Sequence, residues 1–67
     1  MMASKPTDDE ILAAVRDGGR TRIIADRASR FYWGQYIYRR LRILERKGKV
    51  VRHPLYSFNN SIYWVKP

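Results

Sequence analysis

The fold of this chain is decided by residues 34–48, which read GQYIYRRLRILERKG. Within this stretch Ile37, Leu41 and Leu44 recur at intervals of four and three residues. At about 100° per residue, this spacing places the three side chains on one side of a helix. The final glycine is typical of the residue that follows a helix end. The stretch therefore predicts a helix from about Gly34 to Lys47 that packs on the domain through one apolar stripe.

The side of this helix opposite the apolar stripe carries long cations and almost no acid. Glu45 is the only carboxylate in the helix, whereas a helix face that is merely solvated more often interleaves both signs of charge. We therefore interpret this side as a surface for a polyanion, with ordinary solvent exposure as the alternative. The polar side chains are Gln35, Arg39, Arg42 and Arg46, with Tyr36, Arg40 and Ile43 beside them and Tyr38 on the other shoulder.

Charge is distributed unevenly along the 67 residues. Fourteen Lys and Arg against six acids give a net charge of +8, and ten of the fourteen cations are arginine. Residues 1–26 carry a net charge of −1, whereas residues 27–67 carry ten cations, one acid and all nine aromatic side chains. A one-sided basic field concentrates polyanions, and arginine suits forked contacts with phosphates and guanine edges. The distribution indicates a nucleic acid as the partner.

Length and composition argue against several classes of protein. A chain of 67 residues amounts to one small domain without room for a deep active-site cleft. It has no cysteine and one histidine, His53, which argues against disulfide frameworks and the usual metal sites. No run of about 18 apolar residues could span a membrane, and the N-terminus does not resemble a secretory signal. The acids cluster away from His53 and no nucleophile has an evident base partner. We therefore expect no enzyme, no metal or other cofactor, no membrane and no small-molecule ligand.

The N-terminal part of the chain predicts a leader and a first helix. Thr7, with Glu10 three residues later, forms the pattern of a capping box at a helix start. We expect a disordered leader over Met1 to Pro6 and a folded domain over residues 7–67. Gly18-Gly19 is expected to end the first helix.

A second, short helix is predicted directly after these glycines. Thr21 is expected to cap a segment from Arg22 to Ala28. Small residues on its buried side would let another helix cross closely, and this side comprises Ile24, Ala25 and Ala28. A bulky turn, Phe31-Tyr32-Trp33-Gly34, leads into the third helix.

The C-terminal part predicts a β-hairpin. Val50-Val51 begins one strand, and Ile62 to Val65 form the return strand, whose tryptophan is expected in the core as a large apolar lid. Asn59-Asn60 offers a two-residue turn, which would set Tyr56 opposite Tyr63 and Phe58 opposite Ser61. Proline cannot donate to a ladder, so the hairpin is either short or bent near His53-Pro54.

The order helix, short helix, turn, basic helix and hairpin resembles the winged helix-turn-helix family of DNA-binding domains. The resemblance rests on Ile24-Ala25 and on the run from Ile37 to Val50, and it spans roughly residues 8 to 66. It is nearest to the small repressor-like members from archaea, bacteria and their viruses. Two features depart from the family: the turn at Phe31-Tyr32-Trp33 is longer, and the wing lacks a Gly-rich tip. The resemblance implies an α+β fold, three helices followed by a C-terminal β-hairpin wing.

The resemblance also implies that the third helix enters the major groove of DNA while the wing lies along the backbone or an adjacent minor groove. Gln35 could then pair with adenine and Arg39 with guanine. If about six phosphates are neutralised, log affinity falls against log salt with a slope near −5. The expected base-reading residues are Trp33, Gln35, Tyr36 and Arg39, and the expected backbone contacts are Arg22, Arg27, Arg30, Arg40, Arg42, Arg46, Arg52, Asn59 and Asn60.

We expect a sequence-specific double-stranded DNA-binding protein, a transcriptional regulator or repressor, viral or archaeal in type, in the cytoplasm at the nucleoid or in the host cytoplasm. A homodimer would double the number of base pairs that one small module can read. Two other functions stay open. One is non-specific DNA or RNA binding in replication, packaging or chromosome architecture, with the aromatic turn stacking on unpaired bases. The other is a winged helix that binds a protein.

Overall fold

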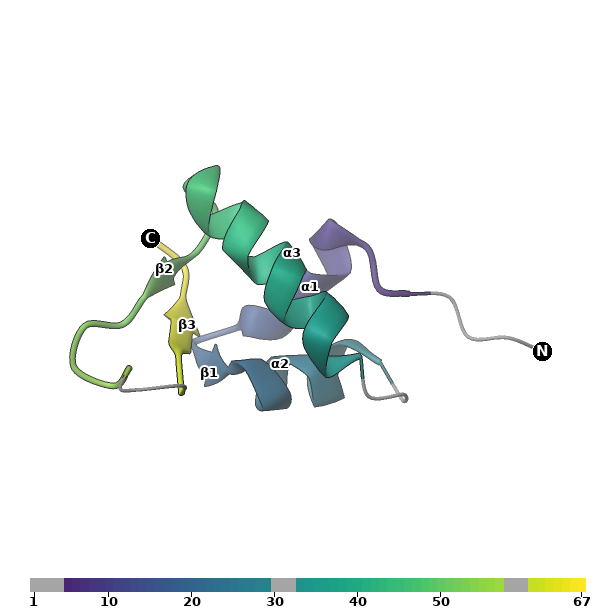
Figure 1. The fold of residues 1–67 in the computed structure, drawn as a ribbon, viewed down its shortest axis with the longest axis horizontal. Helices are drawn as coiled ribbons and strands as arrows, with labels where there is room; N and C mark the ends of the chain where they lie inside the picture. The colour runs from purple at the N-terminus through teal and green to yellow at the C-terminus, as the bar shows by residue number, and fades with distance from the viewer. Residues whose placement is uncertain (1–4, 30–32, 58–60) are drawn as a thin grey trace.

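Three helices and a three-stranded antiparallel sheet make up the part of the chain that the structure, a computed structural model, describes: residues 5–29, 33–57 and 61–67 (Figure 1). The architecture is α+β, as predicted. The sheet has the order β1-β3-β2. The elements are α1 (Asp8–Val15), β1 (Gly19–Arg20), α2 (Thr21–Ala28), α3 (Gly34–Arg46), β2 (Val51–Arg52) and β3 (Tyr63–Val65).

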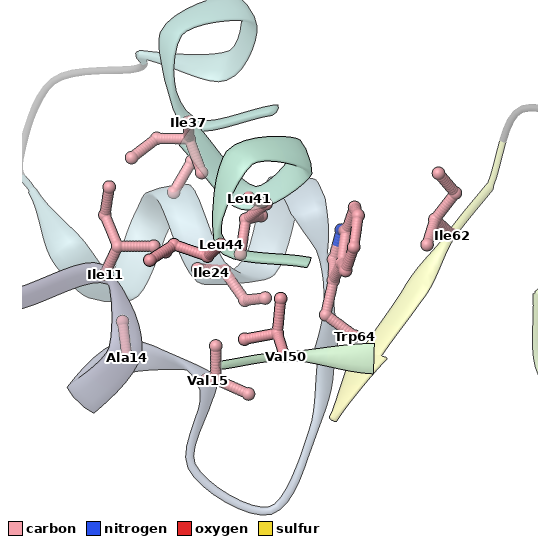
Figure 2. Close-up of a cluster of buried hydrophobic side chains, with 11 residues drawn as sticks. Ile11, Ala14, Val15, Ile24, Ile37, Leu41, Leu44, Val50, Ile62 and Trp64 are labelled. Carbon is pink, nitrogen blue, oxygen red and sulfur yellow. The ribbon is translucent and has the colours of Figure 1, made fainter. Parts of the chain in front are cut away.

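One hydrophobic core joins the three helices to the sheet (Figure 2). The predicted stripe of α3 is confirmed, because Ile37 and Leu41 are fully buried and Leu44 is 3% exposed. Trp64 on β3 is also fully buried, as expected, and its ring lies between the sheet and α3 (Figure 2). The described core residues are Ile11, Ala14, Val15, Ile24, Ala25, Ile37, Leu41, Leu44, Val50, Ile62 and Trp64.

The first helix begins as predicted and ends earlier. Glu10 N donates to Thr7 Oγ1 at 3.2 Å and Thr7 N donates to Glu10 Oε1 at 2.9 Å, which confirms the capping box. The helix ends at Val15, and the next residue, Arg16, has φ 53°. Gly18 instead lets the chain just before β1 pass close to β3, since a Cβ at Gly18 would lie 2.7 Å from Tyr63 Cε1.

Two features of β1 and α2 differ from the prediction. Gly19, expected only to help end α1, instead begins β1 with Arg20; Gly19 pairs with Trp64 and Arg20 with Tyr63. Thr21 does not cap α2: the N-cap residue is Arg20, without a side-chain cap. The Thr21 hydroxyl instead accepts a hydrogen bond of 2.8 Å from Trp64 Nε1. A buried indole N–H needs an acceptor, and Thr21 provides it.

The hairpin is short, and its predicted register is wrong. Val51 pairs with Val65 and Arg52 with Trp64, and His53 N donates to Tyr63 O at 2.7 Å. Tyr63 is therefore opposite His53, three residues before the predicted Tyr56. The first arm leaves the ladder at His53-Pro54, so the hairpin is short, which is one of the two alternatives predicted. The predicted turn at Asn59-Asn60 and the pairing of Phe58 lie outside the described residues.

The end of the predicted leader packs on α3. Pro6 is buried, and its carbonyl accepts a hydrogen bond of 2.9 Å from Tyr36 Oη. Lys5 Nζ lies 5.0 Å from the centroid of the Tyr36 ring. Residues 5 and 6 therefore belong with the folded domain, whereas residues 1–4 lie outside the described range.

Candidate nucleic-acid interface

Three polar side chains on the outer side of α3 are exposed and have no partner among the described residues. Figure 1 shows α3 passing in front of α1, with α2 below the N-terminal end of α3. The side chains of Gln35, Arg39 and Arg46 are exposed, and none of them makes an ion pair or hydrogen bond with another described residue. An exposed arginine without such a partner can bind an anion without first breaking a contact within the protein.

The middle of this helix face is hollowed. Tyr38, Arg39, Arg42, Ile43 and Arg46 border a shallow depression of about 380 Å³. The half-buried Ile43 gives the depression an apolar floor between long cations. An apolar floor with polar edges suits a surface that carries both methyl groups and anionic oxygens, as the major groove of DNA does.

A second hollow, of about 470 Å³, lies at the N-terminal end of α3. Its borders combine two cations, Lys5 and Arg39, with the rings of Trp33 and Tyr36 and the amide of Gln35. No carboxylate borders it among the described residues. Lys5 was not expected here because the sequence places it in the leader, where no pattern distinguishes a packed lysine from a solvated one.

Two of the four predicted base-reading residues, Trp33 and Tyr36, have side chains that are partly buried and pack against the core. Their rings meet edge to face, with centroids 6.4 Å apart and planes at 70°. Trp33 Nε1 is buried without a hydrogen-bond partner in the described part of the chain. Tyr36 uses its hydroxyl on Pro6. Gln35 and Arg39 are therefore the exposed pair among the predicted readers.

Arg40 is one of the predicted backbone contacts that is engaged elsewhere in the protein. Its Nε donates to Asp8 Oδ1 at 2.9 Å and its Nη2 to Asp8 Oδ2 at 2.6 Å. These hydrogen bonds lower the pKa of the Asp8 carboxyl below its ordinary value of 3.8 and raise the pKa of Arg40. A bidentate pair between α3 and the start of α1 fixes the helix in place. The Arg40 guanidinium is therefore held by Asp8 and not presented to a phosphate.

Arg27 is also engaged by the protein itself. Its Nη1 donates to the carbonyls of Ala14, Val15 and Gly18 at 3.2, 3.3 and 3.1 Å. The last carbonyls of a helix have no partner within the helix. A cation at this end is also stabilised by the negative pole of the helix dipole. Arg27 therefore caps α1. This role differs from the one expected, and no sequence pattern indicates a partner 13 residues away.

Arg42 and Arg52 share one carboxylate. Arg52 Nε donates to Glu45 Oε2 at 2.8 Å, and Arg42 Nε lies 3.5 Å from Glu45 Oε1. Arg42 Nη1 also donates to Tyr38 Oη at 2.9 Å. Glu45 therefore links α3 to β2 and partly neutralises two predicted phosphate contacts, although both arginines stay accessible, with side chains 40% and 39% exposed.

The remaining predicted contacts divide into two groups. Arg22 on α2 is exposed and has no partner among the described residues. Arg30, Asn59 and Asn60 lie outside the described ranges. Of the predicted cationic contacts, Arg22, Arg39 and Arg46 are thus exposed and available, and Arg42 and Arg52 are partly paired. Lys5 adds a cation at the edge.

Comparison of this chain with protein-family models, with curated proteins and with solved structures finds no match. Its function is therefore to be inferred from the surface itself. None of the described helices is long and apolar enough to cross a membrane. Over the described ranges there is also no group of three or more His, Cys, Asp or Glu side chains that could hold a metal ion.

Proposed function

We propose that this protein is a winged helix domain that binds double-stranded DNA in a sequence-specific way and acts as a transcriptional regulator, with α3 in the major groove. The observation that supports the proposal best is the outer face of α3, where Gln35, Arg39 and Arg46 are exposed and have no partner in the described part of the chain. Glu45, the one acid of α3, lies on the shoulder toward β2, where it pairs with Arg52 at 2.8 Å and with Arg42 at 3.5 Å.

The dimensions of α3 fit the groove. At about 1.5 Å per residue its 13 residues span about 20 Å. A helix fits a major groove about 12 Å wide, and side chains in its N-terminal half reach the base edges. Gln35 and Arg39 stand in that half, one turn apart, and can form forked contacts with adenine and guanine. Arg46 at the far end is suited to a phosphate, which positions the helix without reading sequence.

The hairpin formed by β2 and β3 is the wing in this proposal. Its first strand carries Arg52, which Glu45 holds beside α3. A cation so placed extends the surface of α3 toward the neighbouring backbone. A dimer on a two-fold site remains part of the proposal and would appear as paired half-sites.

The experiment that tests this function is selection from a random duplex library, followed by fluorescence anisotropy on the selected sequence. We expect Gln35→Ala and Arg39→Ala each to relax preference at one base pair, at about 1–3 kcal/mol per lost forked contact. Arg46→Ala should weaken all sequences alike. Arg16→Gln, which removes one charge just after α1, serves as the matched control.

Two outcomes would count against the proposal. One is a selection that returns no preferred sequence while single strands compete as well as duplex, which would favour non-specific binding through the rings at the second hollow. Alternatively, all of the α3 variants could bind duplex as the wild type does, in which case α3 is not the reading element and a protein partner becomes the better hypothesis.

A further inference from the structure

The connection that follows β2 exposes two apolar residues in succession. Pro54 is exposed, and Leu55 is 82% exposed, the largest fraction among the big hydrophobic side chains that the structure describes. An isolated apolar side chain on a surface is ordinary. Leu55 differs because of how its backbone is held.

Three hydrogen bonds and two ring contacts hold the turn around Leu55. His53 Nδ1 accepts hydrogen bonds from Leu55 N and Tyr56 N, both at 3.2 Å. Ser57 N donates to His53 O at 3.1 Å. The rings of His53 and Tyr56 stack with centroids 4.1 Å apart and planes at 9°, and Tyr56 meets the Tyr63 ring at 5.3 Å. Leu55 is therefore presented to solvent from an ordered turn, so little conformational entropy remains to be lost when it binds.

The chemistry around this turn favours an anionic partner. Residues 46–67 contain five Lys or Arg and no Asp or Glu. Arg52 lies just before the turn, on the strand beside α3. An apolar tip in a purely cationic segment is suited to a polyanion that also offers an apolar interior. Double-stranded DNA has both, since its stacked bases lie between two phosphate backbones.

We propose that Pro54-Leu55 is an apolar wedge that enters the minor groove next to the major groove occupied by α3 and unstacks one base step. Leu and Pro are among the residues that minor-groove proteins insert between base steps, with a kink of about 20–90° toward the major groove. Pyrimidine–purine steps unstack most easily, so the wedge selects such a step without reading its base edges. This inference rests on the proposed function and adds to it that binding bends the DNA.

Two readouts on the full chain test the wedge. One is the fluorescence of 2-aminopurine, placed in turn at each position of the selected duplex, which rises where a base loses its stacking. The other is energy transfer between dyes on the two ends of the duplex, which reports bending. With the wild type we expect one position to brighten and the ends to approach. Leu55→Ala should abolish both signals, and Leu55→Met should retain them.

The control is Ile23→Ala, which removes an apolar side chain that is 44% exposed on α2 and should leave both signals unchanged. If the wild type binds no duplex, the proposed function and the wedge both fail. If it binds duplex but leaves the DNA straight and every base stacked, the wedge alone is overturned. If Leu55→Ala converts a dimer into a monomer in sedimentation, Leu55 is a subunit contact and the wedge is likewise rejected.

Discussion

Glu45 sets how much positive charge the α3 surface offers. It is the only acid in residues 27–67, and its carboxylate pairs with Arg52 at 2.8 Å and with Arg42 at 3.5 Å. We predict that Glu45→Gln binds duplex DNA more tightly than the wild type and steepens the dependence of log affinity on log salt by about one, because a cation is freed for a phosphate.

Anisotropy titrations across a range of salt concentrations measure this effect. Asp17→Asn adds the same charge at an exposed position after α1 and serves as the control for net charge. Equal affinities and slopes for the two variants would mean that Glu45 does not compete with DNA for Arg42 and Arg52.

The sequence could predict on which side of a helix each cation lies, but not which cations make contacts with other residues of the protein. Arg39 and Arg40 are adjacent, yet about 100° of helix rotation separates them, so Arg39 is exposed while Arg40 meets Asp8, 32 residues away in the chain. Arg27 caps α1 in a similar way. Such pairings depend on tertiary distance, which a helical period does not contain. Gln35 and Arg39 were correctly placed on the exposed side because they lie opposite the apolar stripe.

At the scale of elements, the helices follow from local patterns and the sheet does not. The period of Ile37, Leu41 and Leu44 and the capping box at Thr7 are complete within a few residues, so both helices could be predicted. The two-residue strand β1 is too short to show an alternating pattern. The hairpin register depends on Trp64 filling the core and on His53 accepting the N–H groups of the turn, which end the ladder before Tyr56.

The pair between Asp8 and Arg40 fixes α3 against α1, and its contribution to stability should depend on pH. Hydrogen bonds from Arg40 lower the pKa of Asp8 below 3.8. A carboxyl whose pKa is lower in the folded state stabilises that state fully when the pH is above its ordinary pKa. This contribution is lost as the pH falls through the folded-state pKa. We therefore predict that Asp8→Asn lowers the melting temperature at neutral pH and that the difference from the wild type shrinks as the pH falls below 3.8.

Thermal unfolding followed by circular dichroism over this pH range checks the prediction. Asp9→Asn is the matched control, because Asp9 is in the same first turn of α1, is exposed, and has no partner among the described residues. Both variants lose the same interaction with the helix dipole. A pH profile for Asp8→Asn that coincides with that of Asp9→Asn would show that the contact with Arg40 adds nothing to stability.

At the scale of the whole molecule, charge is divided between two parts of the fold. Five of the six acids lie within residues 8–26, on α1, α2 and their connection, whereas ten of the fourteen cations follow residue 26. A molecule polarised in this way orients itself in the field of a polyanion before contact, which raises the association rate at low salt. The same polarity limits the number of phosphate contacts, because Arg40 and Arg27 are turned toward α1.

This limit gives a quantitative prediction for salt dependence. With Arg40 and Arg27 engaged, we expect about four neutralised phosphates instead of about six, and therefore a slope of log affinity against log salt near −3.6 at 0.9 per phosphate. Titrations of the selected duplex between low and moderate salt measure the slope directly, and Arg46→Ala should make it shallower by about one. A slope near −5 would restore the larger set of about six phosphate contacts. A slope shallower than about −2 would be incompatible with a helix seated in the groove by several arginines.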